Sequence, residues 1–253
     1  MAILDEFLLT DRVAIVTGAS SGLGVAFAQG LAEAGASVVL GARRIDKLES
    51  VAQSIRAGGG RAVAVRADVT DPDSCTALAA ATVAEFGRVD ILVNNAGIGT
   101  AYPATRETPE QFRSVMDVNL NGCYWMAQAC GRLMPRGSSI VNISSIVGLT
   151  TAGLPQTAYA ASKAGLIGLT RDLALQWTDR KGIRVNAIAP GFFQSEIFDN
   201  HRPGYMDSLR PRMIIPRLGR LEELAATLVW LVSSAGGYVT GQTIVVDGGF
   251  SIT

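Results

Sequence analysis

The most informative stretch of the chain is a glycine-rich turn, Thr17-Gly18-Ala19-Ser20-Ser21-Gly22-Leu23-Gly24. It follows an apolar run and precedes an Ala-rich segment of helical period, which indicates a turn between a strand and a helix. Glycines at such a turn allow a tight bend and a close approach of the backbone to a pyrophosphate, whose charge the helix N-terminus favours. No lysine lies near the turn, so a phosphate loop of the GxxxxGK[ST] type does not fit.

Outward from this turn, short apolar runs alternate with Ala-rich segments along nearly the whole chain. The predicted strands are 13–17, 37–40, 62–66, 91–93, 139–143, 184–188 and 243–246, and the predicted helices are 23–34, 46–57, 73–86, 109–133, 158–177 and 221–232. Several strands are continuous apolar runs, which is typical of parallel strands covered on both faces. The pattern predicts an α/β fold: a Rossmann-type, doubly wound, seven-stranded parallel sheet with helices on both faces.

No linker, charge block or internal repeat divides the 253 residues, so we expect a single domain, 1–253. The longest irregular region, about 189–220, contains Pro190, Pro203, Pro211 and Pro216. A loop of that length in a compact domain is usually functional, and we expect a lid over a substrate site.

Composition excludes several classes of protein. Lys plus Arg and Asp plus Glu both total 22, and this balance argues against nucleic acid or an anionic membrane surface as a partner. His201 is the single histidine, which excludes a zinc site with two His ligands, and we expect no catalytic metal. Three cysteines outside CxxC spacing indicate a reducing compartment. The acidic N-terminus is unlike a signal peptide, and no apolar run approaches the length of a membrane span, so we expect a cytoplasmic protein.

Tyr159 and Lys163 stand four residues apart in a predicted helix, so both project from one face. An isolated phenol is a poor base at neutral pH, and a neighbouring ammonium favours its phenolate form. Such a pair can exchange a proton with an alcohol or carbonyl oxygen while a hydride moves on carbon.

Three motifs in this order, TGASSGLG, Asn94-Asn95-Ala96-Gly97 and Tyr159-Ala160-Ala161-Ser162-Lys163, resemble the short-chain dehydrogenase/reductase family. The resemblance extends from Leu9 to Gly249 and is nearest to the 3-oxoacyl-carrier-protein reductase branch. It implies that Tyr159 is the acid/base and that Lys163 tunes it and binds the nicotinamide ribose. It also implies that Ser145 orients the substrate oxygen, with Ser144 as a competing candidate, and that Asn119 distorts its helix and completes a proton relay.

The second strand ends with Ala42, Arg43 and Arg44, where relatives that prefer NAD carry an acidic residue. A guanidinium suits a 2′-phosphate, so we favour NADP(H). NAD(H) stays possible because Ser21 stands where NADP-dependent relatives often have a second basic residue. Arg43 and Arg44 could also be solvated charges or stack on adenine.

The resemblance assigns further cofactor contacts. Asp68 and Val69 would bind adenine, although Asp68 could instead open a turn. The remaining implied contacts are Gly18, Ser20, Ser21, Gly22, Leu23, Gly24, Asn95, Ala96, Gly97, Pro190, Gly191, Phe193 and Ser195. Beyond them, Ile197, Phe198, Tyr205, Met206, Leu209, Met213 and Ile214 would make an apolar lid.

The sequence therefore predicts an NAD(P)-dependent oxidoreductase that transfers hydride between nicotinamide and a secondary alcohol or ketone. Sugar, polyol, steroid and small-ketone dehydrogenases of the family share every motif quoted, and a non-catalytic dinucleotide-binding scaffold is the alternative from another class. The resemblance also implies a homotetramer, with 109–133 and 158–177 at one subunit contact.

Overall fold

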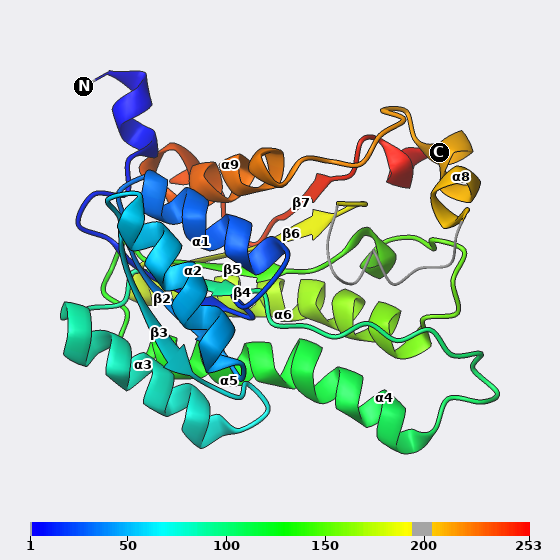
Figure 1. Cartoon of the computed structure of the whole chain (residues 1–253), viewed down its shortest axis with the longest axis horizontal. Coiled ribbons are helices and arrows are strands. Elements are labelled where there is room, and N and C mark those ends of the chain that lie inside the picture. The colour runs from blue at the N-terminus through cyan, green and yellow to red at the C-terminus, as the bar shows by residue number, and fades with distance from the viewer. Residues whose placement is uncertain (1, 194–203) are drawn as a thin grey trace.

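The computed structural model describes residues 2–193 and 204–253. Its centre is a sheet of seven parallel strands in the order β3-β2-β1-β4-β5-β6-β7 (Figure 1). The strands are β1 (Val13–Thr17), β2 (Ser37–Ala42), β3 (Arg61–Arg66), β4 (Ile91–Asn94), β5 (Ser139–Ile143), β6 (Arg184–Pro190) and β7 (Thr243–Val246). This confirms the predicted doubly wound fold.

Helices cover both faces of the sheet (Figure 1). On one face lie α1 (Leu23–Glu33), α2 (Ile45–Ala57) and α9 (Leu221–Val232), and on the other lie α3 (Pro72–Phe86), α5 (Gly122–Gly131) and α6 (Thr157–Lys181). The central strands contribute side chains to the hydrophobic core on each face of the sheet. In β1, Val16 packs with side chains of α1 and α9, and Ile15 packs with side chains of α3 and α5. The side chains of β1 are all buried, which is why the sequence shows a continuous apolar run there.

The segment 109–133, predicted as one helix, is divided in three. It consists of α4 (Pro109–Met116), a π-helical turn at Asp117–Asn121, and α5. Within the π turn the N–H of Gly122 donates to the carbonyl of Asp117, five residues earlier. The turn is therefore one residue wider than an α-helical turn, and it carries the buried side chain of Asn119.

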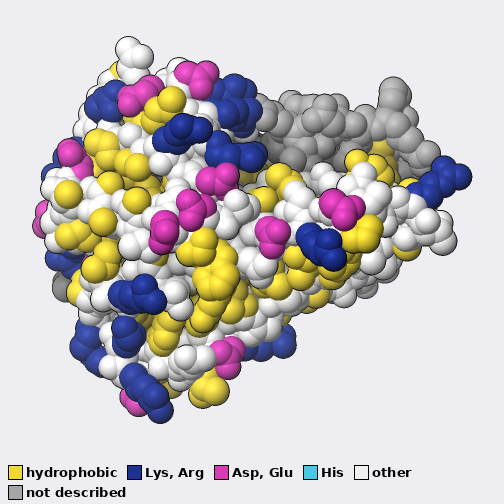
Figure 2. Space-filling model, turned by 90° about the horizontal axis from the view of Figure 1, so that it is seen from below, with side chains coloured by type: hydrophobic (Ala, Val, Ile, Leu, Met, Phe, Trp, Pro, Cys, Tyr) yellow, Lys and Arg dark blue, Asp and Glu magenta, His cyan; other side chains and the backbone are white. Residues whose placement is uncertain are grey.

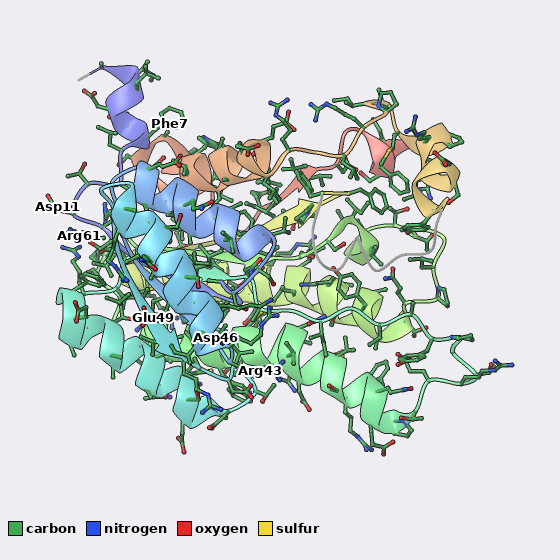
Figure 3. The ribbon with its side chains drawn as sticks, in the orientation of Figure 1. Phe7, Asp11, Arg43, Asp46, Glu49 and Arg61 are labelled. Carbon is green, nitrogen blue, oxygen red and sulfur yellow. The ribbon has the colours of Figure 1, made fainter. Side chains whose placement is uncertain are left out.

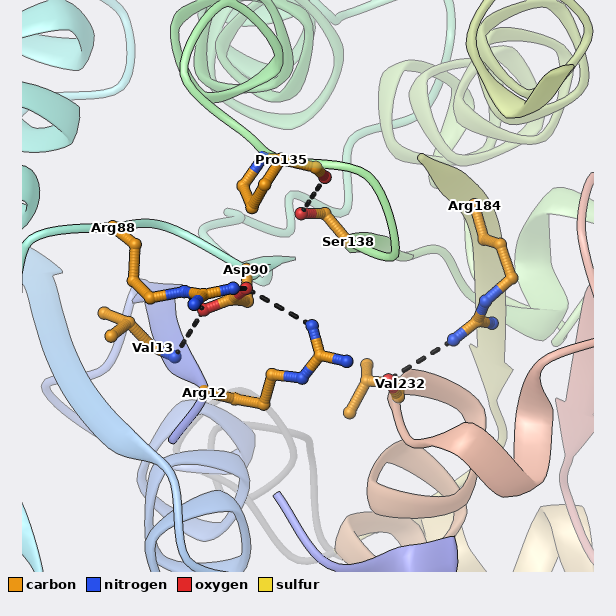
Figure 4. Close-up of polar contacts among 8 residues, drawn as sticks. All are labelled: Arg12, Val13, Arg88, Asp90, Pro135, Ser138, Arg184 and Val232. Atoms are coloured by element: carbon orange, nitrogen blue, oxygen red, sulfur yellow. Dashed lines mark hydrogen bonds and ion pairs between the residues drawn. The ribbon is translucent and has the colours of Figure 1, made fainter. Parts of the chain in front are cut away.

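Charged side chains at the amino edge of the sheet are closely paired (Figure 4). The buried carboxylate of Asp90 accepts from Arg88 at 2.6 and 2.8 Å, from Arg12 at 3.3 Å and from the N–H of Val13 at 3.0 Å. The guanidinium of Arg184 donates to four backbone carbonyls, those of Leu231, Val232, Ser233 and Val239. Burial lowers the pKa of Arg184.

The outer surface of α3, α5 and α4 is the face seen from below (Figure 2). Hydrophobic side chains gather there in a band between scattered charges of both signs. Within residues 2–193 and 204–253, no helix has the length and hydrophobicity needed to cross a membrane. The same residues contain no group of three or more His, Cys, Asp or Glu placed to hold a metal ion.

Candidate active site

A cavity of about 420 Å³ lies at the carboxyl edge of the sheet. The strand order reverses between β1 and β4, which is where doubly wound sheets bind dinucleotides. The cavity runs from the glycine turn, past the ends of β2 and β3, to Tyr159 and Lys163 on α6. It therefore brings together residues far apart in the sequence that the motifs single out.

The glycine turn has the geometry that a phosphate requires. Gly18 and Gly22 have φ angles of +65° and +57°, which side chains rarely adopt. A Cβ on Gly18 would lie 2.7 Å from the Cα of Ala96, so the two loops approach too closely for any side chain. Helix α1 starts at Leu23 with no side-chain cap and no acid in its first turn, which leaves its N–H groups available for an anion. The residues present thus fit a dinucleotide pyrophosphate.

Asn95 fixes the position of this turn. Its amide donates to the carbonyls of Thr17 and Gly18 at 2.9 and 3.2 Å, and the hydroxyl of Thr17 accepts from the N–H groups of Asn95 and Ala96. Asn95, Ala96 and Gly97 line the cavity, whereas Asn94 is buried in the sheet and donates to Asn142. Asn95 thus fixes the position of the glycine turn and also lines the cavity.

Two arginines follow β2 at the adenine end of the cavity. Figure 3 shows Arg43 near Asp46 at the start of α2, away from Arg61 and Asp11, which lie at the left of the view. Both Arg43 and Arg44 line the cavity. The guanidinium of Arg44 donates to the hydroxyls of Ser20 and Ser21 at 2.9 and 3.0 Å, which places a second cation beside the glycine turn.

Asp68 and Val69 line the same end of the cavity, after β3. The Asp68 carboxylate accepts from the N–H and the hydroxyl of Thr70 at 3.0 and 2.8 Å, so it also opens a turn. The Thr70 hydrogen bonds, with help from the nearby charges of Arg43 and Arg66, lower the pKa of Asp68 despite its partial burial. The residue is thus an anion that can accept from adenine.

At the other end, Tyr159 and Lys163 occupy successive turns of α6. The Lys163 ammonium lies 5.6 Å from the centre of the Tyr159 ring and donates to the carbonyl of Ile143 at 2.7 Å. Only 4% of Lys163 is exposed, so its charge acts where water is scarce. A Cβ on Gly97 would stand 3.5 Å from the Lys163 ammonium, which shows that the absence of a side chain keeps this end of the cavity open.

Asn119 is connected to Tyr159 and Lys163 through the buried Ser162. The Asn119 amide donates to the Ser162 hydroxyl at 3.1 Å and to the carbonyl of Ile98 at 2.9 Å, and its oxygen accepts from the N–H of Ile98 at 2.8 Å. Ser162 in turn donates to the carbonyl of Tyr159 at 2.8 Å. The π turn places Asn119 on the side of its helix that contacts the loop after β4.

Ser144 and Ser145 make different hydrogen bonds. The Ser144 hydroxyl donates to the carbonyl of Lys163 at 2.8 Å, and this bond uses its proton. The Ser145 hydroxyl accepts from the N–H of Val147 at 3.2 Å, so its own proton stays available for a substrate oxygen. Both serines line the cavity, and this difference favours Ser145 as the substrate contact.

Residues at the end of β6 and just after it line the cavity. Pro190, Gly191 and Phe193 line it, while Ser195 lies outside the described residues, as do Ile197, Phe198 and His201. Of the expected lid residues, Tyr205, Leu209 and Met213 are buried around Phe250, and Ile214 is largely exposed. Tyr205 begins helix α8 (Tyr205–Leu209) and lines the cavity.

Sequence reasoning did not single out Ser162, the link from Asn119, or Gln156, which lines the cavity next to Tyr159. Ser162 stands three residues after Tyr159, at a spacing that places side chains on one helix face, so this spacing was a usable signal. Gln156 precedes the helix as its N-cap residue, and helical spacing does not place its side chain. The contact between Arg44 and the serines had no comparable signal, because a guanidinium at a strand end can point in many directions.

Comparisons with known proteins agree along nearly the whole chain. The family model described as "Enoyl-(Acyl carrier protein) reductase" matches residues 18–251. The chain is 40% identical to 3-oxoacyl-[acyl-carrier-protein] reductase from Synechocystis over 95% of this chain and 97% of that protein. It is likewise 40% identical to L-rhamnose 1-dehydrogenase (NAD(P)(+)) from Azotobacter vinelandii, over 97% and 98%. Among solved structures, a short-chain dehydrogenase from Burkholderia cenocepacia J2315 in complex with NADP superposes with a TM-score of 0.91 at 32% identity, over 97% of this chain and 99% of that one.

Proposed function

Because the chain belongs to the short-chain dehydrogenase/reductase family of oxidoreductases, which act on alcohol and carbonyl groups, we propose that Tyr159, Lys163, Ser145 and Asn119 perform the reaction. The observation that carries this assignment is the single cavity in which Tyr159, Lys163 and Ser145 meet the glycine turn. A bound nicotinamide dinucleotide would supply or accept the hydride. The pyrophosphate would lie at the N-terminus of α1, between the adenine end and Lys163.

The protein's own part in the reaction is to hold the oxygen and move a proton. In the reductive direction the Tyr159 hydroxyl gives its proton to the substrate oxygen, and in the oxidative direction the phenolate takes it. The Ser145 hydroxyl donates to the same oxygen and stabilises the charge that develops there. The two protons of the Lys163 ammonium not used by Ile143 are available to Tyr159 and to a ribose hydroxyl.

We propose that Asn119 and Ser162 hold the loop after β4 and the start of α6 in place, so that water can connect Lys163 to solvent as a proton relay. Their hydrogen bonds reach from the loop after β4 to the backbone of Tyr159, next to Lys163. The geometry of the π turn holds Asn119 in this position. In this proposal Asn119 is a positioning residue, since its amide contacts neither Tyr159 nor Lys163 in the described hydrogen-bond network.

For the cofactor, we propose a preference for NADP(H) over NAD(H). Arg43 follows β2 where a 2′-phosphate would be placed, and Arg44 stands beside the glycine turn on Ser20 and Ser21. Arg44 thus supplies, from β2, the second cation that the glycine turn itself lacks. The Burkholderia structure in complex with NADP and the relative named for both NAD and NADP are compatible with this choice.

We also propose a cytoplasmic homotetramer built from single domains, 1–253, with 189–220 as the substrate lid. Phe112 on α4 and Leu175 on α6 are 36% and 81% exposed, and hydrophobic side chains form a band on the face of α3, α5 and α4 (Figure 2). An apolar face of this kind suits a contact between subunits. Light scattering coupled to gel filtration tests this proposal, because a monomer would contradict it.

Turnover tests the proposed reaction. The protein is incubated with NADPH or NADH and a panel of ketones, hydroxyketones and 3-oxoacyl thioesters, and cofactor oxidation is followed at 340 nm. We expect oxidation with at least one carbonyl class, and a higher kcat/KM with NADPH. Tight NADPH binding without oxidation by any carbonyl would instead favour the non-catalytic scaffold, and a higher kcat/KM with NADH would reject the NADP(H) preference.

A further inference from the structure

The substrate end of the cavity has an apolar wall. Val147, Ala152, Phe192 and the ring of Tyr205 contribute to it. The Tyr205 hydroxyl donates to the carbonyl of Ala152 at 3.1 Å, which uses its proton. Ser145 and Tyr159 are the polar side chains assigned to the reacting oxygen. Gln156 is a further polar side chain on this part of the cavity.

Gln156 is held firmly by its backbone, whereas its side chain is free. Its carbonyl accepts from the N–H of Ala160 at 2.8 Å in the first turn of α6, and its backbone forms a β-bridge with Tyr102. The residue is partly buried. Across residues 2–193 and 204–253, its carboxamide makes no hydrogen bond with another side chain or with the backbone. A partly buried carboxamide with unused donors and acceptor costs free energy unless a partner or water satisfies it.

The position of Gln156 relative to Tyr159 indicates what that partner is. Gln156 is the N-cap residue of α6, three residues before Tyr159, and both residues line the same cavity. A substrate whose reacting oxygen is bound by Tyr159 and Ser145 therefore presents its neighbouring atoms to Gln156. A carboxamide both donates and accepts, so it can bind either a carbonyl or a hydroxyl.

We infer that Gln156 is a specificity-determining residue that binds a second oxygen of the substrate, one or two carbons from the reacting carbon. The inference rests on the proposed function and narrows it. The preferred substrates are then 3-oxoacyl compounds or hydroxyketones rather than simple apolar ketones. The enzyme would select these substrates because their second oxygen forms a hydrogen bond with the carboxamide that a plain ketone cannot form.

The test compares matched substrates that differ by the second oxygen. One pair is methyl 3-oxobutanoate and 2-pentanone, and the other is 3-hydroxy-2-butanone and 2-butanone. For each pair, the ratio of the two kcat/KM values is measured in the wild type, in Gln156→Leu and in a control, Thr157→Val. Thr157 is the adjacent exposed residue of α6 and does not line the cavity. Binding of NADPH, followed by its fluorescence, verifies that each variant folds and loads the cofactor.

We expect Gln156→Leu to lower the ratio for at least one pair by about tenfold, the usual effect of losing one hydrogen bond to an uncharged group, while Thr157→Val leaves both ratios unchanged. Gln156→Glu, which keeps an acceptor, should recover part of the ratio for the hydroxyketone only. Ratios that stay within about twofold in Gln156→Leu for both pairs would overturn the inference and leave the proposed function intact. Absence of turnover with every carbonyl compound would reject the proposed function and this inference together.

Discussion

Two sets of polar residues at opposite edges of the same sheet differ in how far the protein satisfies them. At the amino edge, Asp90 is buried between two arginines and a backbone N–H, and Arg184 is saturated by four carbonyls. At the carboxyl edge, Ser145 and Gln156 keep hydrogen-bonding capacity that the protein does not use. Satisfied polar groups fix a structure, and unsatisfied ones in a cavity are available to a ligand. The difference indicates that Asp90 and Arg184 serve stability, whereas Ser145 and Gln156 serve chemistry.

The largest expected effect is at the carboxyl edge, in Tyr159→Phe. Loss of the hydroxyl removes the proton donor, so kcat should fall by about 10²–10⁴-fold, the range for removal of a general acid or base. The Kd for NADPH should stay within about twofold, because the ring and Lys163 stay in place. Steady-state rates and fluorescence titration measure the two quantities.

Tyr238→Phe is the matched control for Tyr159→Phe, since Tyr238 is fully exposed. It should leave both quantities unchanged. If Tyr159→Phe retained more than about a tenth of the wild-type kcat, the hydroxyl would not be the acid or base of the reaction.

At the amino edge, Asp90→Ala should act on stability and leave chemistry intact. The free energy of unfolding should fall by about 1–3 kcal/mol, because the buried N–H of Val13 loses its acceptor, while Arg88 and Arg12, whose side chains are 45% and 35% exposed, can be solvated by water. Urea unfolding measures the loss, and the kcat of the folded fraction should match the wild type.

Glu85→Ala provides the comparison for Asp90→Ala, because Glu85 is an exposed carboxylate on α3. It should change the free energy of unfolding by less than about 0.5 kcal/mol. A large loss of kcat in folded Asp90→Ala protein would show that the two edges are coupled rather than separate.

A smaller effect is expected at the adenine end, in Arg43→Ala. Loss of one guanidinium beside a 2′-phosphate should raise the KM for NADPH about tenfold, corresponding to about 1.4 kcal/mol. The KM for NADH should change little, because NADH has no phosphate there. Lys47→Ala, a nearby cation on α2 that does not line the cavity, is the control. Equal increases of both KM values would mean that Arg43 binds adenine or supports the loop.

Much of this arrangement could be predicted from the sequence, for physical reasons that differ between elements. Short runs rich in β-branched residues mark the strands, so β1, β5 and β7 were placed at their observed bounds. The π turn at Asp117–Asn121 could not be derived from periodicity, since one extra residue barely alters an apolar pattern. Tyr159 and Lys163 were found from their spacing. The hydrogen bonds from Arg44 to Ser20 and Ser21 depend on the conformation of a flexible side chain, which sequence patterns do not predict.

The smallest expected effect concerns an ion pair near the carboxyl edge that is exposed rather than buried. Glu223 in the first turn of α9 accepts from Arg217 at 2.8 and 3.0 Å and from the N–H of Arg220 at 2.8 Å, and these bonds lower its pKa from 4.5 to about 2. A depressed carboxyl pKa stabilises the folded state above the unfolded value, and that stabilisation is lost as the pH falls through the folded value. The free energy of unfolding of Glu223→Gln should therefore lie slightly below that of the wild type at neutral pH and converge with it between about pH 4.5 and 2. Added salt should shrink the difference at neutral pH, whereas the Asp90→Ala loss should be less sensitive to salt because the Asp90 carboxylate is buried. A Glu223→Gln difference as large and as salt-resistant as that of Asp90→Ala would show that burial is not what distinguishes the two edges.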